Sequence, residues 1–246
     1  MMGRACLPMY DWPEERATVD ALWAGIRART GGDLPATLTR PVDEPALLAF
    51  WRDPALVFSQ TCWGPLSLGM LPGLRVLAQP DYSDVPGGQG AHYRSVVIAR
   101  QGTSRAALTS KAAPTSKGAD LPEGLLAGRV LAANARHSLS GWLALAADLG
   151  GDPGQLAAGV VETGGHRASI TAVAAGHADL AAVDCRSWAL AGRYEPCAKG
   201  LVVLGWTAAR PGLPYVTGPR TEPALAAGLR ETLIGMGCHP PQEELA

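Results

Sequence analysis

The sequence predicts an α/β protein with a mostly parallel sheet. Apolar, β-favouring runs alternate along the chain with longer stretches of helical periodicity. The 246 residues are 47% hydrophobic and 17% charged, which provides ample material for a core. Polar side chains also follow several apolar runs directly, at the strand ends where α/β sheets bind ligands. This length suits one large domain or two smaller ones.

The expected elements follow from local pattern. The longest helix begins with a proline and two acidic residues, which suit a first turn, and carries a single apolar stripe. We expect strands at Arg4–Pro8, Ala36–Thr39, Leu56–Gln60, Arg75–Ala78, Tyr93–Ala99, Arg129–Ala133, Gly159–Val161, Asp179–Asp184 and Leu201–Gly205. We expect helices at Pro13–Arg29, Glu44–Trp51, Leu139–Leu149, His166–Ala175, Cys185–Arg193 and Glu222–Met236. The polar stretch Gln101–Gly124, broken by two prolines, predicts a surface excursion.

Composition excludes several classes of function. A net charge of −1 and a pI near 6.5 give no attraction to nucleic acid or to anionic membranes. The five cysteines are scattered and form no Cys-x-x-Cys pair, so they predict neither a disulfide framework nor a metal site. We expect no cofactor. As written, the start of the chain has no secretory leader, which predicts a cytoplasmic location, or a periplasmic one if a leader is missing from this chain.

Two strand-to-helix junctions are the most informative stretches. Asn134–Gly141 and Thr163–Ser169 each follow an apolar run and place small hydroxyl residues or glycines where a helix begins. The first turn of a helix has unpaired N–H groups and a partial positive charge, so it binds anions. Taken singly, each junction also fits an ordinary N-cap or turn. Together, and with a histidine in the second, they predict an oxyanion site.

At these residues the chain resembles the phosphate/phosphite/phosphonate-type solute-binding proteins of ABC importers, which have the type II periplasmic-binding-protein fold. The matching motifs are Tyr93-Arg94-Ser95, Asn134-x-x-x-Ser138-x-Ser140-Gly141, Gly165-His166-x-x-Ser169 and the run that continues to Asp184. The resemblance implies two α/β lobes joined by two crossovers, with the ligand in the cleft between them. Lobe one would comprise residues 1–91 and 187–246, and lobe two residues 92–186. Hinge closure would occur near His92-Tyr93 and Asp184–Ser187.

The resemblance also implies a set of ligand-binding residues. Phosphonate or phosphate oxygens would be held by the two serines, the neighbouring backbone N–H groups and the histidine, while the aspartate accepts from a ligand hydroxyl or amine. These residues are Ser138, Leu139, Ser140, Gly141, His166, Asp184 and, lining the cleft, Tyr93. Tyr10 and Thr61 are added only because each follows an expected strand.

One departure from the family pattern concerns the serine motif. Leu139 stands where the family typically has a third hydroxyl, and we expect an arginine to compensate because guanidinium groups bind oxyanions well. The candidates are Arg94, Arg136 and Arg167.

The sequence therefore predicts a non-catalytic, monomeric protein that captures a small oxyanion and presents it to an ABC permease. Two alternatives stay open. One is a cytoplasmic enzyme on the same fold, similar to chorismate dehydratase, and the other is a ligand sensor. A Ser138/His166/Asp184 hydrolase is disfavoured, because no Gly-x-Ser-x-Gly pattern surrounds a candidate serine.

Overall fold

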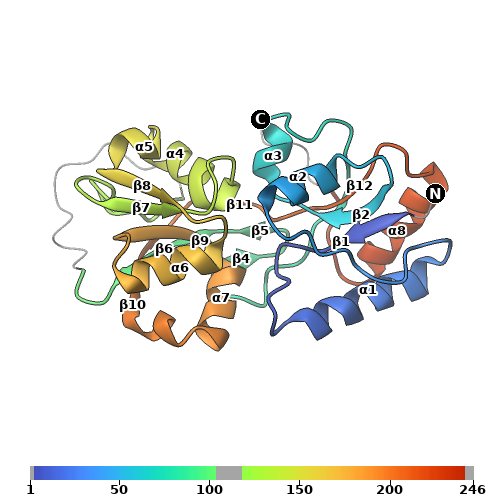
Figure 1. Cartoon of the computed structure of the whole chain (residues 1–246), viewed down its shortest axis with the longest axis horizontal. Helices are drawn as coiled ribbons and strands as arrows, with labels where there is room; N and C mark the ends of the chain where they lie inside the picture. The colour runs from blue at the N-terminus through green and yellow to red at the C-terminus, as the bar shows by residue number, and fades with distance from the viewer. Residues whose placement is uncertain (1–2, 104–117, 242–246) are drawn as a thin grey trace. The chain divides into compact units, whose positions relative to one another are not determined.

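The computed structural model describes residues 3–103 and 118–241, and divides into two compact units (Figure 1). The first unit comprises Met1–Asp81 and Pro211–Ala246, and the second comprises Tyr82–Arg210. The chain therefore passes from one unit to the other at residues 81–82 and 210–211. Most of the excursion expected at Gln101–Gly124 falls on residues 104–117, which lie outside the described residues.

The first unit contains a four-stranded mixed sheet in the order β1-β2-β12-β3. β1 and β2 are parallel, whereas β12 is antiparallel to both β2 and β3. The strands are β1 (Arg4–Cys6), β2 (Leu56–Gln60), β3 (Arg75–Ala78) and β12 (Tyr215–Thr217). The helices are α1 (Arg16–Thr30), α2 (Glu44–Trp51), α3 (Trp63–Ser67) and α8 (Pro223–Gly235).

Aromatic stacking forms the centre of the first unit's core. The rings of Trp23 and Phe58 lie 5.2 Å apart, and those of Phe58 and Tyr215 lie 5.5 Å apart. These three side chains come from α1, β2 and β12, so the stack joins segments that are distant in the sequence. α1 and α8 pack against each other, with a hydrogen bond of 2.9 Å between the hydroxyls of Thr30 and Thr232 (Figure 1).

The second unit contains a five-stranded sheet in the order β10-β6-β9-β7-β8. β7 is parallel to β8 and β9, whereas β6 is antiparallel to β9 and β10. These strands are β6 (Ser95–Arg100), β7 (Val130–Ala133), β8 (Gly159–Glu162), β9 (Leu180–Asp184) and β10 (Leu201–Trp206). A small separate sheet has the order β11-β5-β4, formed by β4 (Gly88–Gln89), β5 (His92–Tyr93) and β11 (Arg210–Pro211).

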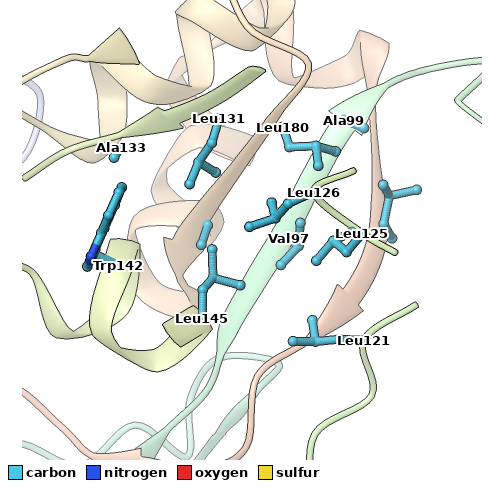
Figure 2. Packing of buried hydrophobic residues seen from close by; sticks show 12 residues of the cluster. Val97, Ala99, Leu121, Leu125, Leu126, Leu131, Ala133, Trp142, Leu145 and Leu180 are labelled. Carbon is cyan, nitrogen blue, oxygen red and sulfur yellow. The ribbon is translucent and has the colours of Figure 1, made fainter. Parts of the chain in front are cut away.

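The helical elements of the second unit follow its strands. They are a π-helical turn η2 (Leu139–Leu143), α4 (Ala144–Leu149), α5 (Pro153–Leu156), α6 (His166–Ala175), α7 (Cys185–Tyr194) and the 3-10 turn η3 (Pro196–Gly200). Figure 2 shows Trp142 and Leu145 of the first two elements among buried side chains of the sheet such as Val97, Leu131 and Leu180. Burial of this apolar set fixes the start of η2 relative to β7 and β9.

Several expectations about the elements were wrong. The helix expected from Pro13 begins at Arg16, after a turn, so neither the proline nor the acidic pair lies in its first turn. The sheets are mixed rather than mostly parallel, because β12 returns between β2 and β3, and β6 runs against its neighbours. Ala36–Thr39 is not a strand, although the Thr39 N–H donates to the Ala5 carbonyl at 2.8 Å. The helix expected over Leu139–Leu149 begins with the π turn η2 and becomes α-helical at Ala144.

The boundaries of the units also differ from the expected lobes. The second unit was expected at residues 92–186 but extends over Tyr82–Arg210. β10 pairs with β6 along its length, which holds residues 187–210 in the second unit. At the other boundary, β4 pairs with β5, so the hairpin that precedes β6 belongs to the same unit.

Candidate functional site

The serine-rich loop after β7 begins a tight helical turn. Ser138 has an extended backbone and caps the turn, with its Oγ accepting from the Gly141 N–H at 3.2 Å. The Ser138 carbonyl accepts from the N–H groups of Trp142 and Leu143, and the bond to Leu143 spans the five residues of a π turn. Ser138 and Ser140 are both buried, and their hydroxyl oxygens lie 3.4 Å apart. Two hydroxyl groups are thus held side by side away from bulk solvent.

Gly141 is required by the close approach of Asn134. A Cβ atom at Gly141 would lie 1.9 Å from the Asn134 Oδ1 atom, which a real side chain cannot tolerate. This Oδ1 atom is buried and has no hydrogen-bond partner among the described residues. The contact between Asn134 and Gly141 therefore requires glycine at position 141. It determines how closely the turn approaches the end of β7.

His166 joins the two junctions that the sequence singled out. It is the first residue of α6 and follows β8 after the pair Gly164-Gly165. The φ of Gly164 is 77°, a conformation that favours glycine. Its Nε2 atom lies 2.7 Å from the Ser140 Oγ, so the side chains of the two junctions are hydrogen-bonded. Which of the two atoms donates depends on the tautomer of the ring.

Burial determines the charge of His166. Desolvation lowers the pKa of its imidazole below the usual 6.5, and this effect outweighs the opposing influences of the Asp184 charge and the Ala182 backbone. The ring is therefore neutral at neutral pH. A neutral imidazole donates through one nitrogen and accepts through the other, so His166 supplies an uncharged donor or acceptor to this site.

Asp184 completes the cluster from the end of β9. Its Oδ1 atom accepts from the Ser187 N–H at 2.9 Å, so the side chain caps α7 as well as facing the site. Its Oδ2 atom lies 3.5 Å from the His166 Nε2, and the residue is 1% exposed. A buried carboxylate is thus fixed next to the donors of the site.

The geometry does not form a catalytic triad. In a Ser-His-Asp relay the nucleophile and the carboxylate approach opposite nitrogens of the imidazole. Here Ser140 and Asp184 both approach Nε2, at 2.7 Å and 3.5 Å. The carboxylate therefore does not hold the ring in the orientation that would make His166 a base toward Ser140.

Tyr93 lies in the same unit but belongs to a second cluster. It is buried in β5, where it pairs with Gly88, and its ring packs 5.6 Å from that of Tyr82. The Arg186 guanidinium lies 4.9 Å over the Tyr82 ring and bonds Asp84 at 2.6 Å. Tyr93 therefore contacts Tyr82, and Tyr82 contacts Arg186 near the start of α7. Arg186 lies two residues after Asp184 in the sequence.

The arginines expected to compensate for the missing hydroxyl at Leu139 are engaged elsewhere. Arg94 donates to the carbonyls of Thr207 and Gly118. The other two form ion pairs, Arg136 with Glu162 and Arg167 with Glu195. The candidate site is therefore built from neutral donors, with no direct arginine contribution in these described contacts.

Tyr10 and Thr61 lie in the first unit, after β1 and β2. Tyr10 is half-buried, whereas Thr61 is fully buried with a hydroxyl that has no partner among the described residues. Trp63, at the start of α3, likewise has a buried indole N–H without such a partner. Trp63 was not among the predicted site residues. Its position three residues after the end of β2 is the signal that could have included it.

Two other kinds of site receive no support within the described residues. In residues 3–103 and 118–241, no group of three or more His, Cys, Asp or Glu side chains could hold a metal ion. No helix in that part of the chain has the length and apolar character needed to cross a bilayer. Cys185 follows Asp184 directly, but burial raises the pKa of its thiol to about 12, which leaves it protonated and unreactive.

Comparison with known proteins decides the family. The family model described as "ABC transporter, phosphonate, periplasmic substrate-binding protein" matches residues 69–246, well over half of the chain. The chain belongs to this family. The match includes the serine turn, His166 and Asp184, and confirms the resemblance stated from the sequence. Among curated proteins, none matches the chain.

Solved structures of similar fold agree with this family. A binding protein component of an ABC phosphonate transporter from Pseudomonas aeruginosa has a TM-score of 0.67 at 14% identity, covering 96% of this chain and 80% of its own. PhnD1 from Prochlorococcus marinus, solved with methylphosphonate, has a TM-score of 0.66 at 15% identity, covering 95% and 83%. A Xanthomonas citri protein bound to chloride has a TM-score of 0.66 at 15% identity, covering 99% and 93%. The type II periplasmic-binding-protein fold is thereby confirmed.

Family membership settles the class of function. A phosphonate-transporter substrate-binding protein is a transport component, so the expectation of a non-catalytic solute-binding protein is confirmed and the enzyme alternative is not supported. Such a protein binds a small ligand and interacts with a permease. The family is periplasmic, and the cytoplasmic location expected from the chain as written is not supported.

Proposed function

We propose that this chain binds a phosphonate or a closely related phosphorus oxyanion at the cluster of Ser138, Ser140 and His166. The observation that carries the proposal is the hydrogen bond of 2.7 Å between Ser140 and His166, which brings together donors from two separate strand-to-helix junctions. Capping a helix needs contacts within one junction only. Polar side chains that converge from two junctions are instead typical of a site that binds a small ligand.

The chemistry of the cluster suits a tetrahedral anion. Hydroxyl groups rotate to donate to an oxyanion, and the N–H groups of the first turn at Leu139 and Ser140 add their partial positive charge. Hydrogen bonds to a charged acceptor are stronger than neutral ones, and the burial of Ser138 and Ser140 removes competition from water. The affinity for the anion then comes from these oriented, uncharged hydroxyl and N–H donors.

The remaining predicted residues extend this proposal. Tyr93 would line the ligand's substituent from the second unit. In the first unit, Thr61 and Trp63 carry buried polar groups without partners among the described residues, and the ligand contacts predicted for Thr61 and Tyr10 stay predictions.

The test is calorimetric titration of the purified chain with methylphosphonate, phosphite, phosphate and sulfate. We expect saturable binding of at least one phosphorus oxyanion, and loss of that binding in His166→Ala. Thr171→Ala is the matched control, since Thr171 is exposed on the same helix α6. Absence of binding by every phosphorus oxyanion, in a protein that melts cooperatively, would rule out the proposal.

A further inference from the structure

The helical element of residues 139–149 carries the serines of the proposed site at one end and a buried ion pair at the other. η2 and α4 follow each other without a break, with Ser140 in the first turn and Asp148 in the last. At a rise of about 1.5 Å per residue, the backbones of these two residues lie about 12 Å apart along the axis. Because the element is one hydrogen-bonded helix, a displacement at Asp148 also displaces the serines.

Asp148 is bound by the chain segment that follows β10. Its Oδ2 atom accepts from the Ala208 N–H at 2.8 Å and from the Arg210 Nη1 at 3.1 Å, and its Oδ1 atom accepts from the Arg210 Nη2 at 2.6 Å. Arg210 also donates to the Ala208 carbonyl at 2.9 Å and lies 3.5 Å from the Ala144 carbonyl at the start of α4. The Asp148 side chain has no exposed surface, and that of Arg210 is 13% exposed. The guanidinium therefore holds both carboxylate oxygens away from bulk solvent.

The segment that carries Arg210 is itself fixed to the sheets of the second unit. β10 pairs with β6 as far as Trp206. Beyond it, the Thr207 N–H donates to the Ser95 carbonyl at 2.9 Å, and the Thr207 Oγ1 accepts from the Ser95 N–H at 2.8 Å. Arg210 begins β11, which pairs with β5, and is the last residue of the unit. Asp148 is thus attached to a segment that has a fixed place on the sheets.

The ion pair supplies a directional contact that apolar packing does not. Trp142 and Leu145 bury apolar surface against the sheet (Figure 2), and this attraction has no preferred direction. A bidentate bond between a guanidinium and a carboxylate has one geometry. Replacing a buried ion pair by well-packed apolar side chains is often neutral or stabilising, so stability alone does not account for this pair.

We propose that Asp148 and Arg210 are positioning residues for the ligand. Their ion pair holds the element 139–149 at a fixed place relative to the sheet, and this keeps the hydroxyls of Ser138 and Ser140 at the spacing from His166 that the ligand requires. Neither residue of the pair touches the ligand. The inference rests on the function proposed above and adds to it two residues that lie outside the motifs of the resemblance.

The test compares Arg210→Lys with the wild type by calorimetric titration with methylphosphonate and by two-dimensional amide NMR of the ligand-free protein. Lysine keeps the positive charge but replaces the planar fork by a single ammonium group, so it cannot hold both carboxylate oxygens in the same geometry. We expect the variant to fold and to bind methylphosphonate about tenfold more weakly. We also expect a shifted amide resonance for Gly141, whose N–H donates to the Ser138 Oγ at 3.2 Å.

Leu229→Ala is the matched control for lost stability. Leu229 is fully buried in α8 of the first unit, so its truncation should lower the melting temperature. Measured well below that temperature, the affinity for methylphosphonate and the Gly141 resonance should keep their wild-type values. A loss of stability by itself would therefore not reproduce the result expected for Arg210→Lys.

The outcomes distinguish this inference from the proposed function. If Arg210→Lys binds methylphosphonate as tightly as the wild type, the pair serves stability alone and the inference is overturned. Weaker binding with an unchanged Gly141 resonance would also overturn it, because the loss would not arise in the serine turn. If methylphosphonate, phosphite and phosphate all fail to bind the wild type, the proposed function has failed. The Gly141 resonance then still decides whether the pair positions the turn.

Discussion

At the scale of single residues, the proposed site depends on a few buried polar side chains. Ser140 is 3% exposed and bonds His166 in the structure, so in the complex its hydroxyl must turn to the ligand. Removing the hydroxyl in Ser140→Ala deletes one hydrogen bond to a charged acceptor. We expect a loss of about 1.5–3 kcal/mol in binding free energy, roughly tenfold to more than a hundredfold in affinity. Calorimetric titration measures it, and an unchanged affinity would exclude Ser140 from the site.

His166 also predicts how stability depends on pH. Its pKa in the folded protein is lowered by burial, so folding favours the neutral ring. The contribution of His166 is therefore fully present above the unfolded pKa of about 6.5 and is lost as the pH falls from there to the folded pKa. Urea unfolding of the ligand-free protein should show stability decreasing over that window, with a shallower slope in His166→Gln. Equal slopes in the two proteins would contradict this.

At the scale of elements, the π turn η2 depends on the absence of a side chain at Gly141. In Gly141→Ala the new methyl group would meet the Asn134 Oδ1 at 1.9 Å, so the turn or the end of β7 must shift. We expect about 1–3 kcal/mol of destabilisation together with weaker ligand binding. Gly192→Ala is the matched control, because its Cβ in α7 would meet nothing within 4 Å. It should be neutral or slightly stabilising by denaturant unfolding.

A buried ion pair anchors α4, the helix that continues η2. The Arg210 guanidinium donates to both oxygens of Asp148, at 2.6 Å and 3.1 Å, and Asp148 also accepts from the Ala208 N–H. The Asp148 side chain has no exposed surface. In Asp148→Asn the Arg210 charge stays buried without its partner, which should cost about 3–5 kcal/mol of stability.

The exposed pair between Arg136 and Glu162 is the comparison for that variant. Both side chains are 54% exposed, and Glu162→Gln should cost less than about 1 kcal/mol. Denaturant unfolding of the two variants measures both values. Similar costs for the buried and the exposed pair would contradict the assignment of an anchoring role to Asp148 and Arg210.

The elements also show what local sequence can predict. The strand ends at Ala133 and Asp184 and the helix start at His166 agree with expectation, because apolar runs, caps and glycines are local signals. The π turn was missed because it depends on the contact between Asn134 and Gly141. The mixed sheets were missed because strand direction is set by pairing partners far away in the sequence, as for β12 with β2 and β3.

At the scale of the whole molecule, the difference between local sequence signals and pairing of distant strands also explains the boundaries of the units. Residues 187–210 were assigned to the first lobe from the resemblance alone. Their place in the second unit follows from the pairing of β10 with β6, which no local pattern reveals. Ser138, Ser140, His166 and Asp184 were expected together from the two strand-to-helix junctions and from the motifs of the resemblance, which follow or end strands β7, β8 and β9 of one sheet.

Ligand binding should stabilise the folded molecule. With methylphosphonate at about a hundred times its dissociation constant, mass action adds about 2.7 kcal/mol, which corresponds to a rise in Tm of roughly 5–10 °C for a chain of this size. A thermal melt with and without ligand measures the rise, and Ser140→Ala should show a smaller one at the same ligand concentration. A Tm that does not respond to any phosphorus oxyanion would contradict the account.

The most direct test of the central claim is a crystal structure of the chain with methylphosphonate. The account predicts phosphonate oxygens within hydrogen-bond distance of the Ser140 Oγ and the His166 Nε2. Without ligand these two atoms lie 2.7 Å apart, and the ligand should replace their hydrogen bond with bonds to itself. A ligand bound elsewhere, with the Ser140–His166 hydrogen bond intact, would contradict the claim that these residues form the binding site.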